Sequence, residues 1–79
     1  YFDLSEEHKT ELVGLLDDCK EFLEQKDEKI EGFNVSINDG ETAGQTIMHC
    51  HIHLIPRRRG DNPNPRGGVR GVIPEKQSY

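Results

Sequence analysis

The stretch His-Cys-His-Ile-His-Leu-Ile at residues 49–55 alternates histidine with apolar residues. In an extended strand, successive side chains point to opposite faces of the sheet. The alternation therefore predicts a strand that carries His49, His51 and His53 in a row on one face, with Met48 and the apolar residues 50, 52 and 54 on the other. Imidazole titrates near neutral pH and serves as a nucleophile, a general acid or a metal ligand. The stretch predicts an active site.

A partner strand is expected just before this stretch. Phe33, Val35 and Ile37 alternate with polar residues, which predicts a strand over about 33–38. Residues 38–45, Asn-Asp-Gly-Glu-Thr-Ala-Gly-Gln, are rich in turn formers. The histidine strand is predicted from Thr46 to about Pro56, where proline is expected to break the ladder. Two strands joined by a glycine-containing loop predict an antiparallel hairpin.

A helix is predicted over about residues 6–26. Ser5 is a suitable N-cap, and Glu6 and Glu7 place negative charge at the positive end of the helix dipole. Gly32 is expected to provide the stop. The predicted apolar stripe, at steps of three and four residues, is Leu12, Leu15, Leu16, Cys19, Phe22 and Leu23.

The remaining chain, residues 59–79, is a Gly/Pro/Arg-rich C-terminal tail with no period, which packing on something else would have to order. Seventy-nine residues suffice for one small domain, and two strands alone are marginal in water. We therefore expect that the chain lacks part of its domain or that partner chains complete it. The absence of an initiator methionine favours a fragment.

The two parts of the chain carry net charges of opposite sign. Residues 1–48 carry a net charge of −9 and residues 49–79 a net charge of +4. The cluster Arg57 to Arg59 fits two interpretations: a cationic field for an anionic substrate such as a phosphate ester, or a solvated strand end. The chain contains no apolar run of membrane-span or signal-peptide length, and Cys19 and Cys50 are expected to be buried free thiols. A cytoplasmic protein with neither a nucleic acid nor a membrane as partner is expected.

The histidines have rival interpretations. Histidines at positions i and i+2 can share a zinc ion. Three in a row on a flat strand cannot converge on one ion without bending, and no carboxylate or cysteine lies at ligand spacing, so we expect no metal and no cofactor. Phosphoryl transfer through a histidine nucleophile is the favoured interpretation. The third interpretation of the histidines is an accidental structural arrangement without a chemical role.

Residues 44–58, Gly-Gln-Thr-Ile-Met-His-Cys-His-Ile-His-Leu-Ile-Pro-Arg-Arg, resemble the signature of the histidine triad (HIT) superfamily, His-φ-His-φ-His-φ-φ with φ apolar. The turns at 38–40 and 43–46 also resemble the family's loop before the triad strand. Residues 64–74 resemble the tail of prokaryotic-type HIT hydrolases, the diadenosine polyphosphate hydrolases among them. The resemblance implies an α+β fold, a HIT-like antiparallel sheet with a packed helix. Residues 1–58 would be the C-terminal part of that domain.

The resemblance also implies roles for individual residues. His51 would be the nucleophile that attacks the α-phosphate, and His53 would protonate the leaving group. His49 would be a buried partner that orients the nucleophile. The residues implied to bind substrate are Asn38, Gly44, Gln45 and Thr46.

The resulting prediction is a nucleotide hydrolase or nucleotidyl transferase that pairs with a second copy of itself. Its substrates would be nucleoside phosphoramidates or dinucleoside polyphosphates, processed through a nucleotidyl-histidine intermediate. One alternative is a non-catalytic nucleotide- or metal-binding module. Another is an interaction fragment that depends on the apolar stripe of residues 6–26.

Overall fold

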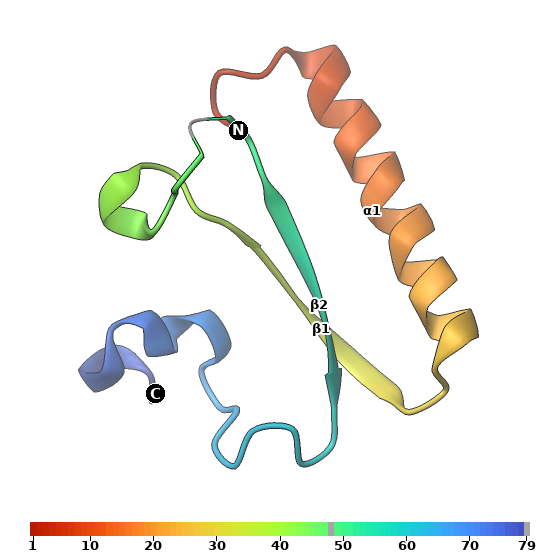
Figure 1. The fold of residues 1–79 in the computed structure, drawn as a ribbon, viewed down its shortest axis with the longest axis vertical. Helices are drawn as coiled ribbons and strands as arrows, with labels where there is room; N and C mark the ends of the chain where they lie inside the picture. Colours follow the sequence, from red (N-terminus) through yellow and green to blue (C-terminus); the bar gives the residue numbers. More distant parts are fainter. Residues whose placement is uncertain (48, 79) are drawn as a thin grey trace.

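The computed structural model describes residues 1–47 and 49–78 of the chain. Within these residues one α-helix, α1 (Glu6–Lys26), packs beside an antiparallel hairpin of two strands, β1 (Ile30–Ile37) and β2 (Ile52–Arg58). Figure 1 shows α1 on one side of the hairpin and the C-terminal tail on the other. The predicted α+β class is confirmed. Met48, which was expected on the apolar side of the histidine strand, lies outside the described residues.

Helix α1 has the predicted bounds. The Ser5 side chain accepts a hydrogen bond of 3.1 Å from the His8 N–H, which satisfies one of the free donors at the helix start. The helix ends at Lys26, and Asp27 turns the chain by accepting a bond of 2.9 Å from the Lys29 N–H. The predicted stop at Gly32 is therefore wrong, because the Asp27 turn ends the helix earlier and Gly32 lies inside β1.

The hairpin differs from the prediction at both ends of each strand. β1 starts three residues earlier than expected and contains an irregularity between Ile30 and Gly32. β2 does not begin near Thr46, because β1 ends at Ile37, opposite Ile52, and offers no earlier partner. Pro56 does not break the ladder. In a two-stranded sheet every strand is an edge strand, where proline is tolerated.

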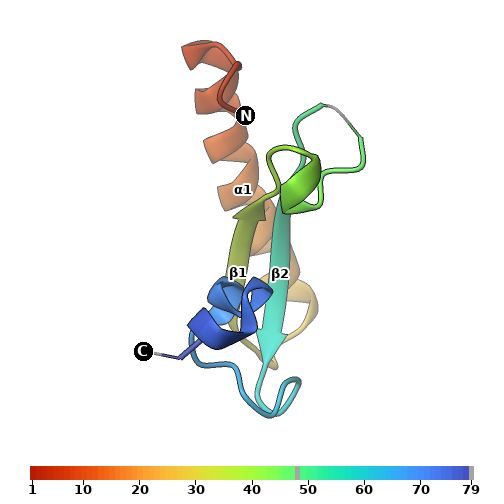
Figure 2. The ribbon, with the colours of Figure 1, turned by 90° about the vertical axis from the view of Figure 1, so that its left-hand side faces the viewer.

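The two faces of the hairpin have different neighbours. Ile52 and Leu54 of β2 share a small apolar hollow with Leu12, Leu16 and other residues of the α1 stripe. Alternation then directs His53 and Ile55 to the other face. Figure 2 shows the short helices of the connection and of the tail in front of the hairpin, with α1 behind it.

The packing between α1 and the hairpin is open. No described hydrophobic side chain is fully buried, and Leu15 of the stripe remains 57% exposed. Cys19 is exposed and Cys50 is only half-buried, so the expectation of two buried thiols is wrong, although both are free. Two strands are too narrow to cover the apolar stripe of a 21-residue helix. No helix among the described residues is long and apolar enough to cross a membrane.

The tail is more ordered than its composition suggests. It contains two short 3-10 helices, η2 (Gly68–Val72) and η3 (Pro74–Lys76). The Gln77 side-chain amide donates to the backbone oxygens of Asn64 (3.0 Å) and Arg66 (3.2 Å) and so holds the tail in a closed form. Gly68 of η2 lies close to Asn34 of β1, which places the tail against the hairpin face opposite α1.

Candidate active site

The connection between the two strands carries most of the predicted site residues. It contains a short 3-10 helix, η1 (Glu41–Ala43), between two glycines with positive φ, Gly40 (91°) and Gly44 (93°). Positive φ angles of this size favour glycine. The Gly44 N–H donates to the Glu41 oxygen (2.9 Å) and the Gln45 N–H to the Gly40 oxygen (3.0 Å). The connection therefore folds back on itself.

Gln45 joins the two halves of this connection. Its Oε1 accepts a hydrogen bond of 2.7 Å from the Gly40 N–H, and its Nε2 donates to the His49 backbone oxygen over 3.4 Å. The first bond is short and the second is at the limit of a hydrogen bond. Gln45 thus fixes the chain that leads into the histidines.

A hollow of about 250 Å³ opens where the connection meets β2. Asn38 lies beside Gly44, since a Cβ built on Gly44 would be 3.5 Å from the Asn38 Nδ2. His51 directly precedes β2, and His53 is its second residue. The residues that line the hollow are Asn38, Gly44, Gln45, Thr46, Ile47, His51 and His53. Six of the seven residues expected from the sequence therefore meet in one place.

His49 is the exception. It does not line the hollow, and its side chain is exposed rather than buried as expected. Its ring lies against that of His51, with 4.9 Å between the ring centroids and an angle of 33° between the planes. The connection that carries His49 stands outside the hairpin ladder, which leaves the ring open to solvent. Contact with His51 is nevertheless in place.

Ile47 lines the hollow but was missed by the sequence analysis. An apolar side chain in a turn-rich stretch carries no chemical signal that would select it. Ser36, which pairs with His53 across the ladder, was also not singled out. The alternation of β1 identifies this serine only once the register is known.

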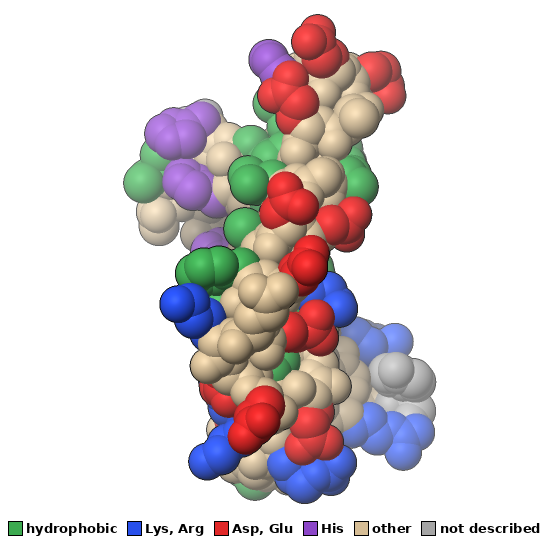
Figure 3. Space-filling model, turned by 90° about the vertical axis from the view of Figure 1, so that its right-hand side faces the viewer, with side chains coloured by type: hydrophobic (Ala, Val, Ile, Leu, Met, Phe, Trp, Pro, Cys, Tyr) green, Lys and Arg blue, Asp and Glu red, His purple; other side chains and the backbone are tan. Residues whose placement is uncertain are grey.

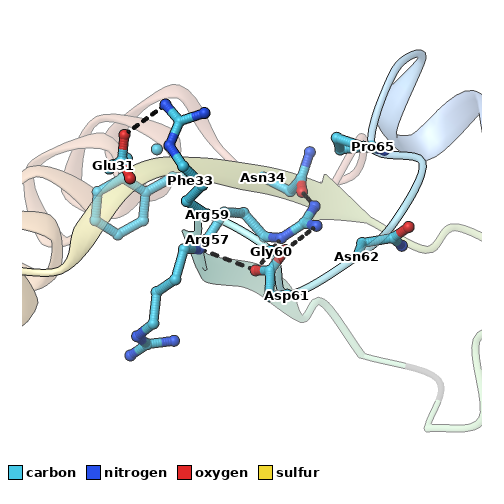
Figure 4. A pocket seen from close by; sticks show the side chains of 11 residues that line it. Glu31, Phe33, Asn34, Arg57, Arg59, Gly60, Asp61, Asn62 and Pro65 are labelled. Carbon is cyan, nitrogen blue, oxygen red and sulfur yellow. Dashed lines mark hydrogen bonds and ion pairs between the residues drawn. The ribbon is translucent and has the colours of Figure 1, made fainter.

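The arginine cluster lies elsewhere. Arg57 forms two bonds of 2.8 Å with the Asp61 carboxylate and a third bond with the Asn34 side chain (Figure 4). Asp61 also accepts from the Arg58 N–H, and these bonds hold the pKa of its carboxyl well below the ordinary value. The same pair raises the pKa of Arg57. Arg58 pairs with Asp27, whose pKa is lowered as a result.

These ion pairs favour the interpretation of the cluster as a strand end over that of a cationic field for a substrate. Arg59 also has an acidic partner, Glu31, at 3.0 Å. His53 and Arg57 are four residues apart on one strand, roughly 13 Å at the rise of an extended chain. The cationic charge is thus paired and distant from the hollow. Figure 3 shows this separation: most visible Lys and Arg side chains lie at the lower end, with the histidines above and acidic side chains along α1.

The metal interpretation has no donor set in this arrangement. Within the part of the chain that the structure describes, no three His, Cys, Asp or Glu side chains are arranged to hold a metal ion. The His49 ring contacts that of His51 but does not line the hollow that His51 shares with His53.

Sequence comparisons agree with this geometry. The sequence model of the HIT domain matches residues 1–60. The chain belongs to the HIT domain family. It is similar to the nitrilase and fragile histidine triad fusion protein NitFhit of Caenorhabditis elegans, with 36% identity over 75% of the chain and 13% of that protein.

Two further HIT relatives match shorter segments. A bis(5'-adenosyl)-triphosphatase of Dictyostelium discoideum is 50% identical over 43% of the chain and 23% of its own length. An adenylylsulfatase of Arabidopsis thaliana is 52% identical over 39% of the chain and 16% of its own length. The chain thus spans less than a quarter of the length of these relatives. No solved structure matches it significantly.

Proposed function

We propose that the protein is a nucleotide hydrolase or nucleotidyl transferase that acts at the α-phosphate through a covalent nucleotidyl-His51 intermediate. One observation carries the proposal: His51 and His53 line the same hollow as Asn38, Gln45 and Thr46. A nucleophile, a proton donor and neutral hydrogen-bonding groups around one cavity are the parts that covalent phosphoryl transfer requires.

The first step transfers the nucleotidyl group to the enzyme. A neutral ring nitrogen of His51 attacks the α-phosphorus and forms an N–P bond. The bond from phosphorus to the leaving-group oxygen breaks, and its electron pair stays on that oxygen. His53, in its imidazolium form, donates a proton to the leaving group. The ring of His49 orients the nucleophile through its contact with His51.

The second step releases the nucleotide. Water attacks the phosphorus of the nucleotidyl-histidine, neutral His53 accepts the proton of the water, and the N–P bond breaks. In a transferase another acceptor takes the place of water. The Asn38 amide and the Thr46 hydroxyl provide donors for the phosphate oxygens, and Gly44 leaves space for them. Gln45 exchanges its long bond to the His49 oxygen for a phosphate oxygen.

The substrate class in this proposal is a dinucleoside polyphosphate, with nucleoside phosphoramidates as the alternative. The names of the relatives support it, since one is a bis(5'-adenosyl)-triphosphatase and another an adenylylsulfatase. Each name describes an adenylyl group joined to a different leaving group. The proposal includes a homodimer and a cytoplasmic location, and the exposed free thiol of Cys19 is suited to a reducing compartment.

Trapping of the intermediate tests the proposal. The full-length protein is mixed with diadenosine triphosphate and quenched in alkali, because a phosphorus–nitrogen bond of this kind is labile to acid. Intact-mass analysis should show one added adenylyl group, and peptide mapping should place it on His51.

Two histidine variants complete this test. His51→Ala should form no adduct and should lose turnover by at least about 10⁴-fold, as removal of a covalent nucleophile does. His8→Ala removes an exposed histidine of α1 and should behave as the wild type. An adduct on any residue other than His51 would overturn the assignment of the nucleophile.

A further inference from the structure

Ser36 lies directly opposite His53 in the hairpin. The antiparallel register pairs Ser36 of β1 with His53 of β2, and Figure 2 shows the two strands side by side. Residues paired in this way project their side chains to the same face of the sheet, with Cβ atoms about 4.5–5.5 Å apart. Ile52 packs toward α1, so this pair shares the opposite face. The register therefore makes Ser36 the cross-strand neighbour of the proposed proton donor.

The two side chains of this pair have no other polar partner. Ser36 is half-buried and His53 is exposed. Within residues 1–47 and 49–78, no hydrogen bond or ion pair engages the Ser36 hydroxyl or the His53 ring. Rotation about χ1 can swing the serine hydroxyl toward the ring, and catalytic hydrogen bonds often close only when substrate is bound.

The other polar side chains of the catalytic hollow have different roles in the proposed mechanism. Asn38, Gln45 and Thr46 bind phosphate oxygens. They are therefore engaged with the substrate rather than with the second nitrogen of the His53 ring. Ser36 lines the hollow between the end of β1, η1 and the tail and not the catalytic hollow. A bond from Ser36 thus leaves the catalytic hollow to the substrate.

The proposed reaction uses one ring nitrogen of His53 and needs the other to keep its proton. As an imidazolium, His53 gives the proton on Nε2 to the leaving group and becomes neutral. Nε2 must then accept the proton of water, so the remaining proton must stay on Nδ1. The hydrogen bond of one ring nitrogen decides which tautomer of a neutral histidine is present. An acceptor beside Nδ1 fixes the required tautomer, and a hydroxyl oxygen can accept.

We propose that Ser36 is a positioning residue whose hydroxyl oxygen accepts a hydrogen bond from the His53 Nδ1–H and holds that proton in place through both steps. Nδ1 is the ring nitrogen nearer to the backbone and hence to the opposite strand, which leaves Nε2 for the substrate. Ser36 acts through His53 and does not contact the reacting atoms. This inference rests on the proposed function, in which His53 is both the general acid and the general base.

Ser36→Thr and Ser36→Val form a matched pair of variants for the full-length protein. Both new residues are β-branched and suit a strand, but only threonine keeps the hydroxyl. The open hollow beside Ser36 has space for the added methyl groups. Ser78→Val removes an exposed hydroxyl of the tail and is the control.

Nitrogen NMR of the isotope-labelled protein measures the tautomer of His53, whose signals are identified by their absence in His53→Ala. At a pH of about 9, where imidazole is neutral, the proton should lie on Nδ1 in the wild type, in Ser36→Thr and in Ser78→Val. In Ser36→Val it should move to Nε2, the nitrogen that carries it in an unpaired histidine. A proton on Nε2 in the wild type, or the same tautomer in Ser36→Val as in the wild type, would overturn the proposal.

Rapid-quench kinetics with diadenosine triphosphate connect the tautomer to the reaction. Hydrolysis of the adenylyl-His51 adduct should slow about tenfold in Ser36→Val, the loss of one hydrogen bond, because the water loses its base. Formation of the adduct should change by less than about threefold, since both nitrogens carry protons in the imidazolium. Ser36→Thr should restore the rate of hydrolysis.

Two further outcomes separate this inference from the proposed function. An equal slowing of both steps, or a slowing that Ser36→Thr shares with Ser36→Val, would overturn the positioning role and leave the proposed function intact. If the wild type forms no adduct while the His53 tautomer still follows the hydroxyl, the proposed function fails and the pairing of Ser36 with His53 stands.

Discussion

The hairpin has a histidine end, where the connection meets β2, and an arginine end, where β2 leads into Gly60 and Asp61. Both ends are rich in side chains that bind anions. At the arginine end Arg57, Arg58 and Arg59 each have a carboxylate partner within the chain. Figure 4 shows the partners of Arg57 and Arg59. At the histidine end the rings of His51 and His53 and the amide of Asn38 line an open hollow. Pairing within the chain, more than formal charge, distinguishes the arginine end from the candidate site at the histidine end.

The largest effect that can test this comparison is expected from His53. His53→Ala should lower kcat for diadenosine triphosphate by about 10²- to 10⁴-fold, as loss of a general acid does. The defect should shrink for a substrate whose leaving group needs no proton, such as adenylyl sulfate. Steady-state kinetics with both substrates measure it.

The matched variant at the arginine end is Arg59→Ala. Arg59 pairs only at the surface, with 85% of its side chain exposed, and its loss should leave kcat/KM within about twofold of the wild type. A defect similar to that of His53→Ala would refute the division between the two ends.

A smaller effect is expected from the glycine that closes the connection. Gly44→Ala should destabilise the protein by about 1–2 kcal/mol, because an L-residue is strained at a φ of 93°. Space does not cause this cost, since the nearest atom to an added Cβ is 3.5 Å away. Gly14→Ala in α1 is the control. It should raise the free energy of unfolding by about 0.5–1 kcal/mol, because alanine favours a helix interior more than glycine does. Chemical denaturation measures the unfolding free energy of both variants. A stabilisation by Gly44→Ala similar to that by Gly14→Ala would contradict the strain argument.

The smallest effect concerns pH at the arginine end. The folded-state pKa of Asp61 lies below its ordinary value of 3.8, so its ion pair contributes fully above that pH. The contribution is lost as the pH falls below 3.8 through the folded pKa. Carboxyl NMR should show Asp61 titrating below 3.8, and Arg57→Gln should return the midpoint toward 3.8. A midpoint that does not move would mean that Arg57 does not lower this pKa.

The sequence predicted the elements more reliably than their ends. Helix α1 could be bounded because Ser5 and the apolar stripe are local signals. The start of β2 could not, because alternation continues through His49 and His51 although β1 has already ended at Ile37. A strand requires a partner across the ladder, and the side-chain pattern does not show where that partner stops.

The residues of the candidate site and their order along the chain could be predicted, but the contacts and exposure of these residues could not. Asn38, Gln45 and Thr46 were expected at the site, and the structure brings them to His51. The exposure of His49 could not be foreseen, since it depends on what covers the connection. The closure of the tail by Gln77 had no local signal either, because glutamine carries none of the turn chemistry that marks Gly or Pro.

The Gln77 closure has a consequence for the order in which the chain assembles. Its two hydrogen bonds span 13 and 11 residues, whereas the pairing of Arg57 with Asn34 spans 23. Closing a loop of about 10 residues takes roughly 10–100 ns, whereas a hairpin forms in about 1–10 μs. The tail can therefore reach its closed shape before the strands have found their register.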